Sequence, residues 1–572
     1  MVRRAADRGG EFGRGPMRSS LAESQRTFEE SDEIDFVIVG SGAAGGVLAA
    51  ELAGAGFDVV VLEQGPWRTA RDFDHDEVGH WIMGDLTGDP RQDPQTFRSD
   101  PSDEAQIASA PPPLIYARGV GGSSVHFTAN YWRLRPLDFR ERSLLGEIPG
   151  TGFADWPLTY EELEPYYSKA EWEIGVSGAP GPFDPPRSRP YPMPPLPVKS
   201  SGVLFEQGAR ALGWHPQPAP MAILSEEYDG RPPCMHCGYC MGFGCEVDAK
   251  SSTLASMIPR AVATGRCEVR PDSTVIRVEV DGAGRATGVI YLDADGREHR
   301  RTARAVVLAA NGAETPRLLL MSESSRFPDG LANGSGLVGK YLMFNGQTAS
   351  HGVFEHPLNE YKSVQVTRIL LDFYESDPAR GFYGGGGMDA RMFNGPLFFA
   401  LGGLPPGVPT WGEEFRRALP DYFSRTMEVA GHTTSLPLET NRVTLDPEIT
   451  DRWGRPAIRT TYRDHPDDLA MMQFFVDRGE EILDAAGASQ VWSDPVGPQT
   501  IGAHLLGTCR MGDDPEASVV DRHHRSHEVR NLFICDGSSM VTSGRGQPTL
   551  TIQALAFRAA EHMAGFASTG EL

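Results

Sequence analysis

The sequence predicts an α/β fold in which a parallel-sheet domain is interrupted by an inserted, mostly antiparallel β-sheet domain with helices. Short apolar runs without breakers occur at the start, middle and end of the chain, at 36–39, 304–310 and 531–536, as buried parallel strands require. The first two lead through a glycine-containing turn into a helical pattern. The stretches between these units differ in composition, which predicts one interleaved domain carrying insertions.

Residues 36–65, FVIVGSGAAGGVLAAELAGAGFDVVVLEQG, read as strand, glycine turn, helix, strand and acid. Gly40, Gly42 and Gly45 have the G-x-G-x-x-G spacing, which predicts a tight turn, a close backbone approach to a pyrophosphate and close helix–strand packing. The free N–H groups at the helix N-terminus suit phosphates. Glu63 ends the second strand, where a carboxylate accepts hydrogen bonds from an adenosine ribose. The stretch therefore predicts a Rossmann-like dinucleotide-binding unit.

Composition narrows the partners. The 572 residues include 40% hydrophobic residues and carry a formal charge of −24, which argues against nucleic acid and anionic membranes as partners. No stretch approaches the ~18 apolar residues of a membrane span. Arg3 and Arg4 are not followed by an apolar segment, so we expect no export signal and a cytoplasmic protein. Residues 1–33 are polar and predict a disordered tail.

Four further stretches have clear patterns. Thr159 to Glu162 form a capping box that opens an amphipathic helix. Residues 178–198 are proline-rich and predict an extended connector. Residues 267–310 alternate and contain turn signals, which predicts a small antiparallel meander leading into a buried strand. Residues 549–566 have apolar positions at helical spacing and predict a final helix.

The distribution of these motifs resembles the glucose–methanol–choline (GMC) oxidoreductase family, flavoproteins that oxidise alcohols. The likeness spans about 34–566, and its cysteine-bearing version looks most like the gluconate dehydrogenase-like, sugar-oxidising branch. It rests on the fingerprint above and on three further places: RGVGGSSVH (118–126) with NYWRLRPLDF, GAETPRLLL (312–320), and the C-terminal run HLLGTCRMG, SVVD, NLFICDGS and QPTLTIQALAFRAA.

The resemblance implies a discontinuous FAD-binding domain made of 34–140, 200–345 and 500–566. The segments 141–199 and 346–499 would then form the substrate-binding domain and its connector.

The resemblance also implies which residues contact the cofactor. Gly121 and Gly122 let backbone lie against a flavin or pyrophosphate with no Cβ in the way. A histidine at the place of His126 holds the flavin covalently in some relatives, so covalent attachment through His126 and simple packing against the ring are the two alternatives. The remaining residues expected in the cofactor site are Arg118, Ser123, Val275, Asp536 and Gly537.

The catalytic residues expected from the resemblance are His504 and Gln547. A neutral histidine suits the base that takes the hydroxyl proton while the flavin takes the hydride. His504 precedes GTCRMG and matches the family's catalytic histidine. The second active-site residue of the family is an asparagine or histidine, and this chain has Gln547 there. Gln547 can hydrogen-bond a substrate hydroxyl but is not a base.

Four cysteines lie within twelve residues, with the spacing C-x₂-C-x₂-C-x₄-C: Cys234, Cys237, Cys240 and Cys245. Three interpretations remain open for them. Thiolates this dense can hold an iron–sulfur cluster that relays electrons from the flavin. They can bind zinc. They can also form disulfides or stay as free thiols.

The leading functional prediction is FAD-dependent oxidation of a hydroxyl group on a sugar, glycoside, polyol or aminosugar. The alternatives are an oxidase or dehydrogenase of an aryl or long-chain alcohol, and a flavin electron-transfer subunit within a complex. The sequence leaves the electron acceptor open between oxygen, a quinone and a cytochrome subunit, so an acceptor subunit remains an alternative partner.

Overall fold

Five parallel strands form the sheet that the sequence predicts. In the computed structural model, which describes residues 21–109, 111–392 and 395–572, the strand order is β18-β10-β1-β2-β6. Every residue of four of these strands is buried, as their apolar sequences require. The strands are β1 (Phe36–Val39), β2 (Val59–Leu62), β6 (Cys267–Arg270), β10 (Ala305–Leu308) and β18 (Leu532–Ile534).

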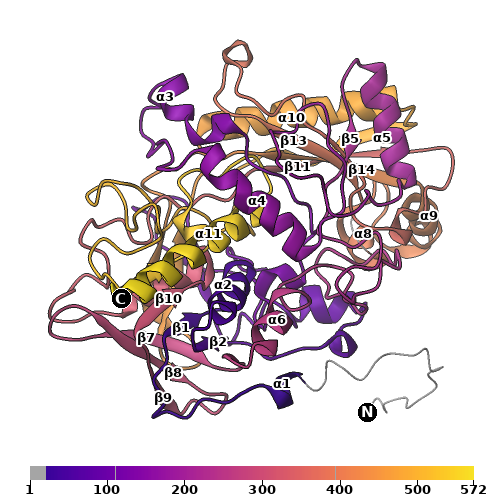
Figure 1. The fold of residues 1–572 in the computed structure, drawn as a ribbon. Helices are drawn as coiled ribbons and strands as arrows, with labels where there is room; N and C mark the ends of the chain where they lie inside the picture. The colour runs from indigo at the N-terminus through magenta and orange to yellow at the C-terminus, as the bar shows by residue number, and fades with distance from the viewer. Residues whose placement is uncertain (1–20, 110, 393–394) are drawn as a thin grey trace.

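Helices flank this sheet in the lower half of the molecule (Figure 1). α2 (Ala43–Gly54) follows the glycine turn and packs against α6 (Met257–Ala263) and the final helix α11 (Thr549–Thr569). α11 also contacts α4 (Tyr160–Ile174), which begins at the predicted capping box: Thr159 Oγ1 accepts from the backbone N–H of Glu162. α7 (Asn311–Met321) follows β10 and completes the second strand–turn–helix unit.

The predicted meander is confirmed with one correction. β7 (Thr274–Val280), β8 (Ala286–Leu292) and β9 (Glu298–Thr302) pair antiparallel in sequence order. Residues 267–270, which the alternation placed in the same meander, instead form β6 and pair in parallel with β2. Three of the four residues of β6 are buried, so its side chains belong to the central core.

The predicted antiparallel sheet lies in the upper half of the molecule (Figure 1) and has six strands. Their order is β17 (Gln490–Ser493), β11 (Gln347–Val353), β14 (Thr426–Thr433), β13 (Gly386–Arg391), β12 (Arg368–Leu370) and β5 (Gln217–Pro218). α10 (Pro466–Ala485) and α5 (Ser200–Ala211) share a hydrophobic cluster with these strands. The fold class predicted from the sequence, a Rossmann-like domain with an inserted antiparallel domain, is confirmed.

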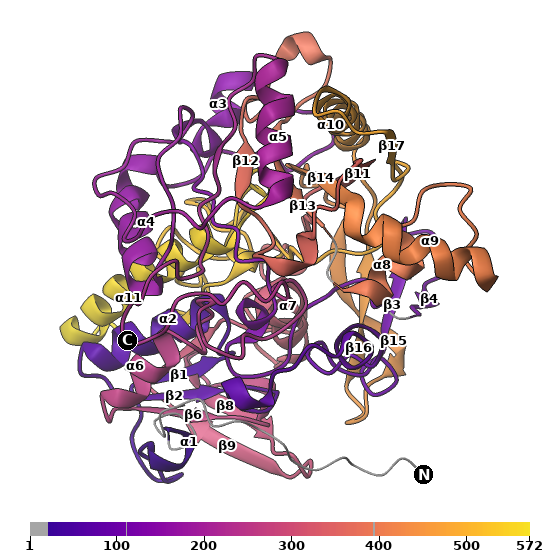
Figure 2. The ribbon, with the colours of Figure 1, turned by 90° about the vertical axis from the view of Figure 1, so that its right-hand side faces the viewer.

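A smaller sheet crosses the expected domain boundaries. β16 (Pro456–Thr461) pairs with β15 (Arg442–Thr450) on one side and with β3 (Gln95–Arg98) on the other, and β4 (Gln106–Ile107) extends the sheet (Figure 2). β3, β4 and α5 come from segments that were expected in the FAD-binding domain, yet they pack with the inserted part. Pairing with β16 satisfies the backbone groups of β3.

The remaining α-helices of the described residues are α1 (Leu21–Ser24), α3 (Glu141–Leu145), α8 (Pro396–Gly402) and α9 (Gly412–Arg425). The last two stand at the edge of the molecule in Figure 2. The proline-rich stretch 178–198 contains no helix or strand, as its composition predicts.

The expectation of a disordered tail is wrong for its second half. Residues 21–33 pack on the protein: the Phe28 side chain is 1% exposed, and its backbone N–H donates to Glu268 over 2.8 Å. Burial of the Phe28 ring offsets the conformational entropy that is lost when this segment is ordered. Residues 1–20 lie outside the described part of the chain.

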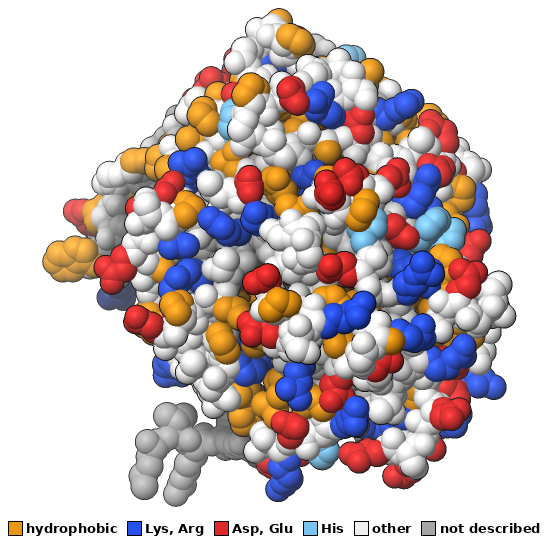
Figure 3. Space-filling view, turned by 90° about the vertical axis from the view of Figure 1, so that its left-hand side faces the viewer, with side chains coloured by type: hydrophobic (Ala, Val, Ile, Leu, Met, Phe, Trp, Pro, Cys, Tyr) orange, Lys and Arg blue, Asp and Glu red, His pale blue; other side chains and the backbone are white. Residues whose placement is uncertain are grey.

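The surface mixes acidic and basic side chains with scattered apolar ones, as the face in Figure 3 shows. Among the described residues, no helix is both long and apolar enough to cross a bilayer.

Candidate active site

One large cavity lies where the parallel sheet meets the six-stranded sheet. Its volume is about 440 Å³, and residues from the start, middle and end of the chain line it. Residues just after β1, β2, β10 and β18 open into it, so the cavity lies outside the carboxyl ends of the parallel strands. This is where open α/β sheets bind their ligands.

The glycine turn after β1 has the geometry that a dinucleotide requires. Gly40 has φ +94°, and a Cβ on Gly45 would lie 2.0 Å from the Gly40 carbonyl oxygen, so both positions need glycine. Gly42 is the N-cap of α2 and supplies no side-chain cap. The first N–H groups of α2 are therefore left for a ligand at the cavity wall, and the site fits a pyrophosphate.

Glu63 lines the cavity next to this turn. Its carboxylate accepts from Ser41 Oγ over 2.8 Å and from the backbone N–H groups of Ser41, Gly65 and Gly119 over 3.1–3.2 Å. Burial raises the pKa of Glu63, while these donors favour its ionised form. The carboxylate is thus held in place at the position predicted to meet a ribose.

The segment 119–126 lies against the glycine turn. Gly121 and Gly122 have φ values of +98° and +52°, and a Cβ on Gly122 would stand 2.7 Å from Gly42 Cα. A side chain on Gly122 would therefore collide with the backbone of the first glycine turn. His126 ends this segment and lines the cavity, and its Nε2 has no hydrogen-bond partner among the described residues. Burial and then the Lys250 charge lower the pKa of His126 to about 4, so the ring is neutral.

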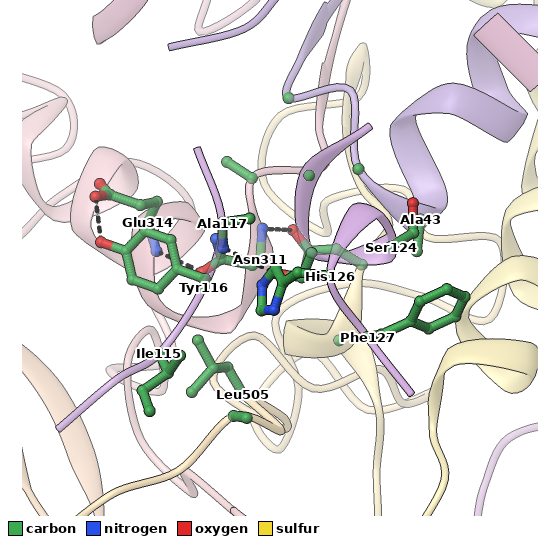
Figure 4. A pocket seen from close by; sticks show the side chains of 18 of the residues that line it. Ala43, Ile115, Tyr116, Ala117, Ser124, His126, Phe127, Asn311, Glu314 and Leu505 are labelled. Atoms are coloured by element: carbon green, nitrogen blue, oxygen red, sulfur yellow. Dashed lines mark hydrogen bonds between the residues drawn. The ribbon is translucent and has the colours of Figure 1, made fainter. Parts of the chain in front are cut away.

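Asp536 follows the last strand, β18, and its side chain is hydrogen-bonded to the first turns of α7. Its carboxylate accepts from the Asn311 N–H over 3.0 Å and from Thr315 Oγ1 over 2.6 Å, and burial raises its pKa. Nearby in the wall, the Tyr116 hydroxyl donates to Glu314 over 2.7 Å (Figure 4). The polar side chains around the middle of the cavity are therefore hydrogen-bonded to one another or to the backbone.

The structure gathers most of the residues that the sequence singled out. The cavity lining contains Gly40, Gly42, Glu63, Gly122, Ser123, His126, Val275, His504, Asp536, Gly537 and Gln547. Gly45 and Gly121 lie behind that lining. Arg118 does not reach the cavity, because its guanidinium pairs with Asp93 instead.

His504 lies at the end of the cavity nearest the six-stranded sheet. Its Nδ1 is 3.1 Å from Asn345 Oδ1. The Asn345 amide nitrogen donates to the Thr433 carbonyl over 3.0 Å and to the carbonyls of Ser543 and Gly544 over 3.3 Å each. Three acceptors fix which end of the amide is nitrogen, so Oδ1 must accept a hydrogen bond from the Nδ1–H of His504. The Nε2 atom is therefore the unprotonated nitrogen.

Burial, and then the nearby His432 and Arg391, lower the pKa of His504 to about 3. The ring is neutral at physiological pH and has a lone pair to accept a proton.

Sequence reasoning missed Asn345, Arg391 and His432. Asn345 precedes a glycine and reads as an ordinary turn, yet it contacts a histidine 159 residues away. Arg391 is the last residue of β13, and His432 lies in the adjacent antiparallel strand β14; both line the cavity with Gln547. The available signal was a pair of opposite charges, Asp389 and Arg391, within the buried strand β13. Charged residues are seldom buried without a role.

The cysteine loop is not arranged as a metal centre in the described residues. Throughout residues 21–109, 111–392 and 395–572, no group of three or more His, Cys, Asp or Glu side chains is placed to hold a metal ion. Cys234, Cys237, Cys240 and Cys245 are free thiols in this structure, which is one of the alternatives that the sequence left open. Burial raises the pKa of Cys234 to about 12 and of Cys240 to about 11, which keeps both protonated.

A buried lysine ties this loop to the cavity wall. Lys250 Nζ donates to the carbonyls of Cys240, Phe243 and Phe127 over 2.6, 2.7 and 3.1 Å. The Gly242 N–H donates to the His126 carbonyl over 2.7 Å. The loop therefore supports the position of His126.

Two models of one family match the chain. The N-terminal model of the GMC oxidoreductases matches residues 34–342, and the C-terminal model matches residues 437–556.

Curated relatives agree with this match over nearly their whole length. The chain is 36% identical to 2-methyl-1,2-propanediol dehydrogenase of Mycolicibacterium austroafricanum, covering 93% of this chain and 95% of that protein. It is 32% identical to paromamine 6′-oxidase of Streptomyces fradiae, covering 96% and 95%. The fold is similar to that of formate oxidase from Aspergillus oryzae, with a TM-score of 0.65 at 15% identity, covering 95% of this chain and all of that one.

Proposed function

This chain belongs to the GMC oxidoreductase family, FAD-dependent enzymes that oxidise alcohols, and we propose that it oxidises a hydroxyl group of a sugar-like or polyol substrate with His504 as the base. The single observation that carries the assignment of the base is the Asn345–His504 hydrogen bond, which leaves Nε2 unprotonated at the cavity. One relative is named for a propanediol and another for paromamine. Both compounds bear hydroxyl groups, and paromamine also bears amino groups.

The residues divide the work between the two ends of the cavity. Bound FAD supplies the hydride acceptor. The α2 N-terminus and Glu63 would hold its pyrophosphate and ribose. His504 Nε2 takes the hydroxyl proton as the carbon–hydrogen bond breaks, and Asn345 keeps the ring in the tautomer that can do so.

Gln547 has the second role that we propose at the substrate end. It lines the cavity on the segment that leads into α11. Its amide can donate to and accept from a substrate hydroxyl but cannot take up a proton. The proton therefore goes to His504 alone, and Gln547 positions the carbon that loses hydride.

The test is anaerobic reduction of the bound flavin by sugars and polyols. Reduction is measured as the loss of the yellow flavin colour. We expect His504→Asn to slow reduction at least about 100-fold while flavin stays bound, because the proton acceptor is lost. Gln547→Ala should slow it by roughly 10–1000-fold, the range for a lost positioning contact. The exposed His356 provides the matched control, His356→Asn, which should behave like the unaltered protein.

Two results would contradict this function. Retained reduction in His504→Asn would remove His504 from its role. Bleaching by aryl or long-chain alcohols alone would move the enzyme to another substrate class.

We also propose that the flavin is attached covalently through His126. The unpaired Nε2, the neutral ring and its place in the cavity wall support this, since only an imidazole with a free lone pair can form the bond. Flavin should then stay with the polypeptide after denaturation in acid, and mass spectrometry should find it on the peptide that contains His126. Full release of flavin would show that His126 only packs against the ring.

A further inference from the structure

The substrate end of the cavity is built on a buried ion pair whose positive side faces inward. Arg391 Nε donates to Asp389 Oδ1 over 2.6 Å, and its Nη2 donates to Asp389 Oδ2 over 2.5 Å. Arg391 lines the cavity, whereas Asp389 is 0% exposed and lies behind the wall. The pair is neutral as a whole, but its cation is the part that a ligand meets.

The neighbours of this pair hold it in that orientation. Asp389 Oδ2 also accepts from Asn130 Nδ2 over 3.0 Å and lies 2.8 Å from His432 Nε2. Arg391 Nη2 lies 2.8 Å from the same His432 nitrogen. Asn130 and His432 line the cavity too. Contacts with Asn130 and His432 therefore keep the Asp389 carboxylate behind the cavity wall and the Arg391 guanidinium at the cavity surface.

This cation lies beside the proposed reaction centre. Arg391 and His504 line the same cavity, and the charge of Arg391 contributes to lowering the pKa of His504. His432 lies against Gly546, where a Cβ would stand 2.5 Å from the His432 Cβ, and Gln547 is the next residue. The electropositive wall, the base and the positioning amide thus border the same space.

No carboxylate balances Arg391 on the cavity side. Among the lining residues that the structure describes, the acids are Glu63, Glu314 and Asp536. Glu63 and Asp536 follow strands of the parallel sheet and are engaged there. Glu314 accepts from Tyr116 and pairs with Arg317. The acids next to Arg391, Asp389 and Glu428, are buried and do not line the cavity. An ammonium group arriving at the substrate end would therefore meet the guanidinium first.

We propose that Arg391 determines the substrate specificity of this site, favouring alcohols that are uncharged or carry a carboxylate and rejecting alcohols with an ammonium group near the reacting carbon. The inference rests on the proposed function and adds the charge of the substrate. The guanidinium donates to oxygen atoms of a polyol or carboxylate, and it repels a cation in an enclosed space where water screens little.

Two matched series of substrates test this inference at pH 7, where the amines are protonated. The six-carbon series is gluconate, sorbitol and 1-amino-1-deoxysorbitol. The three-carbon series is glycerate, glycerol and 3-amino-1,2-propanediol. Within each series, kcat/KM for flavin reduction should be at least about 10-fold lower for the amine than for the neutral alcohol, and the carboxylate should equal or exceed the neutral alcohol.

The outcomes separate this inference from the function on which it rests. Reduction by both series with equal or better use of the amines would overturn the inference and leave the function standing. No reduction by any of the six compounds would overturn both.

Variants test the residue itself. Arg391→Gln should lower the ratio of kcat/KM for the carboxylate to kcat/KM for the amine by at least about 10-fold. Arg391→Lys should largely keep this ratio, since the positive charge remains. The double variant Asp389→Asn with Arg391→Gln avoids a buried unpaired carboxylate and should show the same narrowing if the single variant folds poorly. Arg368→Gln is the matched control: Arg368 belongs to the same sheet, pairs with Glu206 and does not line the cavity. An unchanged ratio in both Arg391→Gln and the double variant would overturn the role of Arg391.

Discussion

Asn345 connects a single side chain to the proposed chemistry. It has φ +66°, a left-handed conformation that asparagine tolerates and that aims its amide at His504. The amide acts through the imidazole, so Asn345 is a positioning residue. Its contribution is the choice of tautomer, because a ring free to place its proton on Nε2 would present a donor where the reaction needs an acceptor.

Replacing Asn345 by glycine tests that contribution, and it also removes the three hydrogen bonds from the amide to backbone carbonyls. Glycine adopts the same backbone conformation without strain, so Asn345→Gly removes only the amide. We expect flavin reduction at saturating substrate to slow by about 10–100-fold, with flavin content unchanged, measured by stopped-flow absorbance. Asn359→Gly is the matched control, since Asn359 is exposed and also left-handed, with φ +52°. Equal rates in the two variants would show that the amide does not orient the ring.

At the scale of an element, α2 and the turn before it depend on the absence of one side chain. Gly45 lies on the face of α2 that contacts the Gly40 carbonyl and the Ala309 side chain. Any Cβ there pushes the helix away from β1 and moves the N–H groups that we expect to bind a pyrophosphate.

Two alanine substitutions in the same helix should therefore have opposite effects. Gly45→Ala should lower the free energy of unfolding by about 1–3 kcal/mol and reduce the flavin content, because the new Cβ would lie 2.0 Å from a backbone oxygen. Gly54→Ala meets nothing within 4 Å and should be neutral or stabilise by up to about 1 kcal/mol. Thermal unfolding and the ratio of flavin to protein absorbance measure both. A Gly45→Ala protein with full flavin content would contradict the close packing described here.

At the scale of the whole molecule, residues 25–33 pack across the parallel-sheet domain and contact both β6 and β9. Gln25 exchanges two hydrogen bonds with the backbone of Val269 in β6, each 2.9 Å long. Arg301 of β9 donates to the carbonyls of Glu29 and Asp32. Between these contacts, Phe28 enters the main hydrophobic core. The segment thus links the edge of the parallel sheet to the meander.

Removing the Phe28 ring should therefore weaken the whole protein. Phe28→Ala is expected to cost about 3–5 kcal/mol, the usual range for a buried phenylalanine. Leu144→Ala, at a leucine that is 66% exposed, is the control and should cost little. Thermal unfolding compares the two variants. A similar, small loss in both would mean that the segment contributes nothing to the core.

The sequence by itself determined the local units: the glycine turn with Glu63, the capping box of α4, the meander strands and the final helix. Each of these depends on residues close together in the chain, whose spacing fixes the backbone they can adopt. The motif around His504 also identified the proposed base, through its resemblance to a family.

Only the tertiary structure decided what lies around that base. Asn345, Arg391 and His432 come from separate segments, and no local pattern brings them to one cavity wall. The pairing of β3 with β16, the burial of Phe28 and the placement of the four cysteines as free thiols likewise depend on contacts between distant segments. Such contacts are selected by the packing and hydrogen bonding of the complete fold, which is why sequence spacing could not predict them.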